Sequence, residues 1–269
     1  MTLIKYPRTQ HIKGSRFQHG DHDLEAVDWH ELRGKNLVVE EKMDGSNVGV
    51  SFLENGQMML QSRGHYLRGG PREKHFAQFK QWASAKQEEL FCVLGSRYVM
   101  YGEWLHAKHT MYYDAFPHFF MEFDVLDTKD NSNVFLSTGE RNSLFSVISN
   151  VIFPVKVLAE GKFDELDDLE KLVVKSHFVS VDNNERMNNL KNAARSAGTD
   201  PADVQKHTDP SNLMEGLYVK WEEDGLVKGR YKFVRESFTS SILDQETHWQ
   251  DRPLVFNKLK VGGYENMYE

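Results

Sequence analysis

The stretch LVVEEKMDG at residues 37–45 is an apolar run that ends in a lysine, an aspartate and a glycine. The run predicts a strand, and a second strand-like segment follows at residues 47–53. Asp44 and Gly45 are ordinary turn formers, so the pattern predicts Lys42 in a tight turn between two strands, where its amine can face a pocket. Lysine is a nucleophile only when neutral, and this chemistry therefore requires cations or burial that lower the pKa of Lys42.

The four residues Lys42 to Gly45 carry little information alone. With average residue usage, such a pattern occurs by chance in roughly one chain in twenty of this length. Taken in isolation, it is better explained as a solvent-exposed turn. The motifs that follow it in the sequence reverse this balance.

The first of these motifs is a hairpin around Asn55-Gly56, the strongest short-range signal for a two-residue turn. Strands are predicted at residues 48–52 and 58–62, and a two-residue turn would place Arg63 opposite Val48, close to Lys42. An arginine there can hold a phosphate or a ribose through its planar guanidinium. A solvated arginine at the end of a strand is the alternative.

Two further strands carry candidate residues at residues 98–104 and 119–125. Glu103 places a carboxylate at the end of the first strand. In the second, alternation puts Phe123 on one face with Phe119, Met121 and Val125. Aromatic residues on strands usually belong to the core, so Phe123 taken alone would be assigned to the core.

A second hairpin is predicted at residues 213–220 and 227–235, turning through Asp224-Gly225. Its second strand alternates, with Lys228, Arg230 and Lys232 on one face. A two-residue turn would place Lys232 opposite Leu217 and Val234 opposite Glu215, which makes Glu215 and Lys232 diagonal neighbours. A carboxylate beside a row of cations suits a metal-bound polyphosphate, and a solvated ribbon of salt bridges is the alternative.

In this order, the motifs resemble the covalent nucleotidyltransferase superfamily of ligases and capping enzymes, and most closely the ATP-dependent RNA ligases of the RNA ligase 2 type. The resemblance covers residues 35–260, since residues 246–249 and 252–259 are similar to the tail of bacterial and phage RNA ligase domains. The motifs that carry it are Lys42-Met43-Asp44-Gly45, Ser62-Arg63, Tyr101-Gly102-Glu103-Trp104, Phe123, Glu215-Gly216-Leu217-Tyr218-Val219-Lys220 and Arg230-Tyr231-Lys232.

The resemblance implies that ATP is the cofactor and that Lys42 attacks its α-phosphate, releases pyrophosphate and holds AMP. It further implies a role in nucleotide binding for four other residues: Glu41 at the adenine edge, Arg63 at the ribose or phosphate, Glu103 at the ribose, and Phe123 stacked on adenine.

The same resemblance implies a catalytic Mg²⁺ or Mn²⁺ held by Glu215, with Glu103 as a second metal-binding candidate. Arg230 and Lys232 would neutralise the α-phosphate and help to activate Lys42. Family members usually have lysine at the Arg230 position, and arginine differs from lysine in reach and geometry. Nucleotidyl transfer depends mainly on positioning and charge neutralisation, which agrees with this set of residues.

The implied substrate is RNA with 5′-phosphate and 3′-hydroxyl ends, joined by transfer of AMP to the 5′-phosphate and attack by the 3′-hydroxyl. Asp44, Asn47, Glu215 and Lys220 are candidate helpers in these steps, and a partner protein could recruit the RNA. The alternatives are a minimal ATP-dependent DNA ligase, a capping-type enzyme that uses GTP, and a nucleotide-binding module without catalysis. Simple binding does not need a nucleophilic lysine, so the combination of Lys42, Glu215 and Lys232 disfavours the module.

The expected architecture is α+β, with two antiparallel sheets flanked by helices and the nucleotide pocket between them. We expect one domain over residues 1–269, with a helix around residues 73–89, a mainly helical excursion at 138–207 and a helical tail at 238–269 that includes a helix at 240–249. Only about 34 residues follow Arg235, too few for an OB-fold domain.

Composition is compatible with this function without indicating it. The net charge of −7, from 40 acidic and 33 basic residues, lacks the global basic character of many nucleic-acid binders. Local basic clusters occur at residues 63–74 and 228–235. The single cysteine, Cys92, excludes an internal disulfide and a zinc site built from cysteines. No apolar stretch approaches the length of a membrane span, and residues 1–16 are too polar for a signal peptide. We therefore expect a cytoplasmic protein of a bacterium or a phage-infected cell.

Overall fold

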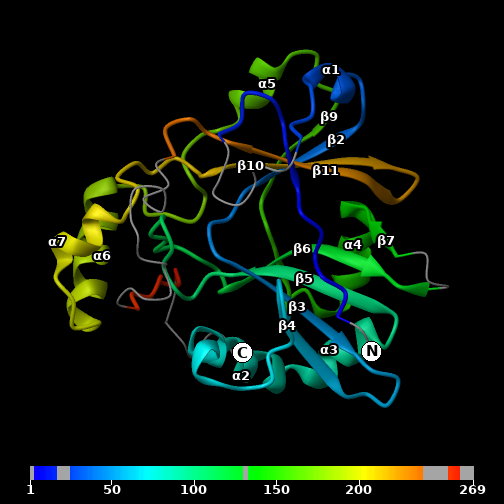
Figure 1. Cartoon of the computed structure of the whole chain (residues 1–269), viewed down its shortest axis with the longest axis horizontal. Coiled ribbons are helices and arrows are strands. Elements are labelled where there is room, and N and C mark those ends of the chain that lie inside the picture. The colour runs from blue at the N-terminus through cyan, green and yellow to red at the C-terminus, as the bar shows by residue number, and fades with distance from the viewer. Residues whose placement is uncertain (1–2, 17–24, 130–132, 239–253, 261–269) are drawn as a thin grey trace.

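A computed structural model describes residues 3–16, 25–129, 133–238 and 254–260 of the chain (Figure 1). Its strands form one hydrogen-bonded sheet in the order β4-β3-β5-β6-β7-β11-β10-β2-β9, and neighbours along this path are antiparallel. The strands of this path are β2 (Leu37–Glu41), β3 (Ser46–Phe52), β4 (Met58–Ser62), β5 (Tyr98–Trp104), β6 (Phe120–Asp127), β7 (Val134–Leu136), β9 (Val157–Gly161), β10 (Gly216–Glu223) and β11 (Leu226–Val234).

The expectation of two separate sheets is wrong for the described strands, because β7 joins them. This three-residue strand pairs with β6 on one edge and with β11 on the other. Figure 1 shows the resulting two arms: β3, β4, β5 and β6 form the first arm, and β2, β9, β10 and β11 form the second arm. The fold is therefore a mixed helix and sheet fold built on one antiparallel sheet.

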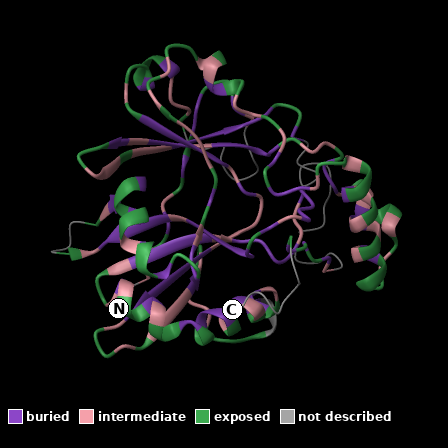
Figure 2. Ribbon diagram, turned by 180° about the vertical axis from the view of Figure 1, so that it is seen from behind, coloured by how far each residue is buried: buried purple, intermediate pink, exposed green. Residues whose placement is uncertain are grey.

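Helices lie on the outer sides of both arms, with exposed residues on the side that faces away from the sheet (Figure 2). Residues 71–94 are helical in three segments, close to the helix predicted at 73–89, and they pack under the first arm with Phe79, Trp82 and Ala83 buried. The helices are α1 (Trp29–Leu32), η1 (Pro71–Phe76), α2 (Ala77–Ala85), α3 (Gln87–Leu94), α4 (Thr138–Phe145), η3 (Ser146–Ile148), α5 (Leu166–Glu170), α6 (Asn183–Ser196) and α7 (Pro201–Lys206). No helix in the described ranges is long and apolar enough to cross a bilayer.

The segment 138–207, expected to be mainly helical, also contains strands. β8 (Phe153–Pro154) pairs with β6, and β9 forms the edge of the second arm beside β2. The apolar spacing at 163–177 yields only the short helix α5. Helices make up most of the regular structure of this segment, whereas residues 157–161 pair on a sheet edge that no local pattern in the sequence marks.

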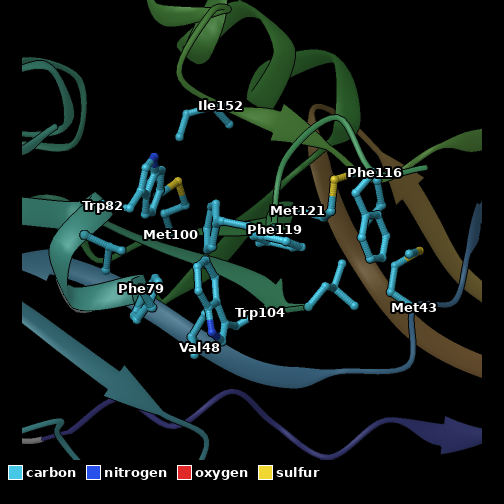
Figure 3. Close-up of a cluster of buried hydrophobic side chains, with 14 of the residues drawn as sticks. Met43, Val48, Phe79, Trp82, Met100, Trp104, Phe116, Phe119, Met121 and Ile152 are labelled. Atoms are coloured by element: carbon cyan, nitrogen blue, oxygen red, sulfur yellow. The ribbon is translucent and has the colours of Figure 1, made fainter. Parts of the chain in front are cut away.

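The main hydrophobic cluster extends from the helices under the first arm to the turn that carries Lys42 (Figure 3). Trp82 stacks on Phe120 at 4.8 Å between ring centroids. Met43 lies at the other end of the cluster beside Phe116, and its side chain is buried. Burial of Met43 anchors the turn, so the residues on either side of it, Lys42 and Asp44, are held in place by the core.

Both predicted registers are wrong by one residue. In the first hairpin the loop has three residues, with Gly56 at φ +80°, so Ser62 rather than Arg63 lies opposite Val48. In the second hairpin the turn has two residues, as expected, and Asp224 and Gly225 both have positive φ.

A β-bulge accounts for the second error. The register of β10 and β11 shifts between Trp221 and Glu222, so Lys232 pairs with Tyr218 instead of Leu217. Glu215 lies just outside β10, and its carbonyl accepts the amide of Arg235. Glu215 and Lys232 are therefore not the diagonal strand neighbours that the two-residue turn predicted.

The described part of the expected helical tail is extended. Residues 254–260 form isolated bridges with residues 107 and 116, and the side chain of Asn257 bonds to the amide of Tyr113 and the carbonyl of Leu105. These contacts support the loop at 105–113, which approaches Asp44. The helix predicted at 240–249 lies outside the described residues.

Candidate active site

A cavity of about 510 Å³ is lined by residues of both arms and of the N-terminal segment, a volume suited to a small ligand. It collects predicted site residues that are far apart in the sequence. Those that line it are Glu41, Lys42, Asp44, Asn47, Arg63, Glu103, Phe123, Glu215 and Lys232.

Lys42 and Glu215 meet inside this cavity. The Nζ of Lys42 lies 2.6 Å from Oε1 of Glu215, and their side chains are 18% and 1% exposed. The amide of Lys42 also donates to the carbonyl of Gly216 at 3.0 Å. The pairing of β2 with β10 brings the two residues together, because it places Leu217 opposite Glu41.

The pKa of Lys42 differs from the sequence expectation. Burial by itself would lower the pKa, but the ion pair with Glu215, together with the nearby carboxyl groups of Glu103 and Asp44, raises it above its ordinary value. The amine is therefore protonated in the ligand-free protein. Activation of Lys42 requires a change in the charge around it.

Glu103 lies near the end of β5, close to this ion pair, and its neighbour across the strands is Asn47. Burial raises its pKa to about 8, with Lys42 opposing the shift and Glu215 and Asp44 adding to it. At neutral pH the group is mainly a neutral carboxylic acid. A cation or a hydroxyl group bound nearby would shift the pKa of Glu103.

Asp44 has a clear structural task in the turn. Its Oδ2 accepts the amides of Thr110 and Met111 at 2.7 and 2.6 Å, and its own amide donates to the hydroxyl of Tyr113. Gly45 follows at a close approach of two chains: a Cβ there would lie 2.8 Å from the carbonyl oxygen of Trp104. Only glycine fits without movement, which explains the glycine of the motif.

Glu41 presents one oxygen to the cavity. Its Oε2 accepts the amide of His177 at 3.1 Å and the ring Nδ1 of His177 at 3.0 Å, and the hydrogen bond raises the pKa of that imidazole. Its Oε1 is buried and has no hydrogen-bond partner within the described part of the chain. The carboxylate can therefore accept a hydrogen bond from a ligand.

Phe123 departs from the predicted alternation. The pairing of β5 with β6 shifts where Tyr101 faces Asp124 and Gly102 faces Glu122, so Phe123 is the bulged residue. Met121 and Val125 are buried in the core as expected, whereas Phe123 is half-buried and lines the cavity.

Arg230 lies away from the cavity, contrary to its expected position beside the α-phosphate. Its guanidinium lies over the rings of Phe135 and Tyr6, at 3.7 and 5.3 Å from their centroids, and it is not among the cavity-lining residues described. Lys220, a candidate helper, is fully buried behind the cavity, where Glu40 and Asp124 pair with it. Lys220 is thus held by ion pairs, and Arg230 by contacts with aromatic rings.

The two predicted basic clusters have different positions. Arg63 and Arg68 are exposed, and Arg63 stands at the cavity. In the second cluster, Lys232 is buried at the cavity, but Arg235 is buried in an ion pair with Asp209. The row at 228–235 therefore does not form one basic surface.

Residues that the sequence analysis did not single out also contribute to the site: Tyr6 and Thr9 line the cavity directly, and His177 contacts Glu41, which lines it. Their positions depend on long-range packing, and no local motif marks them. His65 and His109 also line the cavity, and in the described part of the chain no group of three or more histidine, cysteine or acidic side chains could hold a metal ion by itself.

Comparison with known proteins identifies the family. The family model described as RNA ligase matches residues 35–234. No curated protein sequence matches the chain.

Solved structures agree in fold. An RNA ligase of Naegleria gruberi with PPi is 17% identical, with a TM-score of 0.53, covering 91% of this chain and 64% of that chain. An archaeal ATP-dependent RNA ligase is 14% identical, with a TM-score of 0.51, covering 88% and 49%. A Naegleria gruberi RNA ligase variant with AMP and Mn is 15% identical, with a TM-score of 0.52, covering 88% and 58%. The chain spans about half to two thirds of the length of these proteins, and by its family model it belongs to the RNA ligase family.

Proposed function

We propose that this chain is an ATP-dependent RNA ligase that joins RNA 5′-phosphate and 3′-hydroxyl ends through an AMP carried on Lys42. The observation that carries the proposal is the ion pair of Lys42 and Glu215 inside a cavity that also holds Lys232 and Glu103. Membership of the RNA ligase family supports it, as do related structures that contain PPi, or AMP and Mn.

The cavity suits an adenine nucleotide. The unpartnered Oε1 of Glu41 can accept a hydrogen bond from the exocyclic amino group of adenine, whereas guanine would present a carbonyl oxygen there. The ring of Phe123 is placed to stack on the base, Glu103 to bond to the ribose, and Arg63 to contact ribose or phosphate. This arrangement favours ATP over the GTP of a capping-type enzyme.

The donors for a divalent metal are Glu215 and Glu103. Mg²⁺ usually keeps several waters and is held by one or two carboxylates together with substrate phosphates, so the absence of a three-ligand cluster in the described residues fits this chemistry. The unpartnered Oδ1 of Asn47 adds a buried oxygen to the same cavity. A bound metal would neutralise phosphate charge and lower the pKa of Lys42 by electrostatic repulsion.

In the first step, Lys42 must lose its proton to solvent and its ion pair with Glu215. Its Nζ then forms a bond to the α-phosphorus of ATP while the bond from that phosphorus to the bridging oxygen breaks, and pyrophosphate leaves. Lys232 supplies positive charge to the phosphates from within the cavity. Burial of Met43 and the hydrogen bonds of Asp44 hold the amine in position.

In the second step, a 5′-phosphate oxygen of RNA attacks the phosphorus of AMP and releases Lys42. In the third, the 3′-hydroxyl attacks the 5′-phosphorus, AMP leaves and the hydroxyl proton passes to solvent. Arg63 is exposed at the cavity and Arg68 is exposed five residues further on, and both can contact the RNA backbone. Asp44 and Asn47 would act by positioning, and a partner protein in the cytoplasm could recruit the RNA.

Intact mass spectrometry tests the proposal. Incubation with ATP and Mg²⁺ should add one AMP to the protein, and Lys42→Ala should abolish the adduct. Lys171→Ala, at an exposed lysine paired with Asp168, is the matched control and should be adenylylated normally. Addition from GTP instead of ATP would favour capping, sealing of nicked DNA but not of RNA would favour a DNA ligase, and an unchanged mass would favour a binding module.

A further inference from the structure

Residues 3–16, here called the N-terminal strap, connect the two arms of the sheet and precede the segment that matches the family model. Figure 1 shows the strap in dark blue, running from the first arm to the second. At its beginning, the carbonyl of Ile4 accepts hydrogen bonds from Gln61 and Tyr101, both at 2.9 Å. This end is therefore fixed to the first arm.

The other end of the strap is fixed to the second arm. β1 (Gln10–His11) pairs in parallel with Tyr231 and Lys232 of β11, and the amide of Ile12 donates to the carbonyl of Lys232 at 3.0 Å. Further along, the hydroxyl of Ser15 accepts the amide of Val234 at 2.9 Å. The strap therefore pairs directly with the strand segment that carries Lys232.

Between these two anchors, Tyr6 and Thr9 line the cavity. The hydroxyl of Tyr6 donates to Oδ2 of Asp124 at 2.5 Å and contacts the hydroxyl of Tyr218. The ring of Tyr6 lies 5.2 Å from the ring of Phe123, at 80° to it. Tyr6 is 6% exposed, and its ring also contacts the rings of Tyr101 and Phe135.

We propose that Tyr6 is a positioning residue for nucleotide binding, which holds the ring of Phe123 in the orientation that receives the base. Phe123 sits at a bulge, so its direction is not set by regular pairing with β5. The perpendicular contact with Tyr6 supplies that constraint, and the bonds to Asp124 and Tyr218 keep Tyr6 itself in place. This inference rests on the proposed nucleotide site and assigns the strap to it.

The test is calorimetric measurement of ATP binding without divalent metal, in a Lys42→Ala background that cannot form the adduct. Tyr6→Leu removes the aromatic pair and should raise the Kd for ATP about three- to tenfold. Tyr6→Phe keeps the ring and should leave the Kd within about twofold, while the loss of the hydroxyl lowers the melting temperature. In the protein that retains Lys42, Tyr6→Leu should raise the KM for ATP in adenylylation and leave the rate at saturating ATP within about twofold.

Leu126→Ala is the matched control, because Leu126 belongs to the same buried cluster as Tyr6 but is not a cavity-lining residue in the described structure. It should lower the melting temperature without changing the Kd. An unchanged Kd in Tyr6→Leu, or equal weakening by Tyr6→Phe or by Leu126→Ala, would overturn the inference. If the protein with Lys42 binds ATP but forms no adduct, the proposed function fails while the Kd series still decides the role of Tyr6.

Discussion

Lys42 and Glu215 are 173 residues apart in the sequence and form an ion pair with 2.6 Å between Nζ and Oε1. The pair holds the lysine in its charged, unreactive form, because Glu215 opposes the loss of its proton. The carboxylate that pairs with this proposed nucleophile is also the principal metal-binding candidate. Recruitment of Glu215 by a metal would thus release Lys42 for attack.

Glu215→Gln should have two separable effects. It removes a metal-binding carboxylate and should raise the Mg²⁺ concentration for half-maximal adenylylation by about 10- to 100-fold. It also removes a negative charge that raises the pKa of Lys42, so the pH profile of adenylylation at saturating Mg²⁺ should move to lower pH. Initial rates of adenylylation across a range of pH and Mg²⁺ concentration measure both effects. If neither the Mg²⁺ requirement nor the pH profile changed, Glu215 would not be a metal ligand or a control on Lys42.

Glu103→Gln should change how stability depends on pH. The folded protein raises the pKa of Glu103 from 4.5 to about 8, so between these values the folded state keeps a proton that the unfolded state has lost. Wild-type stability should therefore decrease as pH rises through this window, by at most about 1.4 kcal/mol per pH unit. Glu103→Gln has no such proton and should gain stability relative to wild type between pH 5 and pH 8. Urea unfolding of both proteins measures this, and an equal difference in stability at pH 5 and at pH 8 would contradict the assignment.

Gly45→Ala should damage the turn that carries Lys42. The added Cβ would lie 2.7 Å from Cδ2 of Leu105 and 2.8 Å from the carbonyl oxygen of Trp104, so the turn must shift. We expect a loss of about 1–3 kcal/mol in unfolding free energy together with slower adenylylation. Gly139→Ala in α4 is the control, because its Cβ would meet nothing closer than 4.0 Å, and it should leave both quantities close to wild type.

Substitutions of Arg230 and of Lys232 should have different effects, although the two residues belong to one motif. Arg230→Met removes stacking on Phe135 and should cost about 1 kcal/mol of stability, with the ATP affinity within about twofold of wild type. Lys232→Met removes a charge from the cavity and should slow adenylylation by about 10²- to 10³-fold. Unfolding and adenylylation assays of both variants test this difference. If Arg230→Met slowed the reaction as strongly as Lys232→Met, the placement of Arg230 outside the cavity would be contradicted.

Local sequence motifs predicted the strands that carry the site, because alternation and turn residues are local properties. The turn at Lys42 and the two-residue turn at Asp224-Gly225 are examples. The chemistry of lysine, arginine and carboxylate side chains then indicated phosphate and metal binding. These signals can be recognised in a single sequence because each depends on a few neighbouring residues.

Register and long-range contacts could not be predicted in the same way. A bulge near Trp221 displaced Lys232 by one position, and another exposed Phe123, yet neither bulge has a local signature. Tyr6 and His177 reach the site through segments whose docking depends on the completed sheet. The pKa of Lys42 is raised rather than lowered for the same reason, since Glu215 and Glu103 reach it from other segments of the chain.

Peptide mapping by mass spectrometry after incubation with ATP and Mg²⁺ shows directly whether Lys42 carries AMP. We expect AMP on the peptide that contains Lys42, bound through an acid-labile bond from phosphorus to nitrogen, and its loss from the protein when RNA with a 5′-phosphate is added. AMP on a different residue, or no AMP on any peptide of a folded protein that binds ATP, would contradict this expectation.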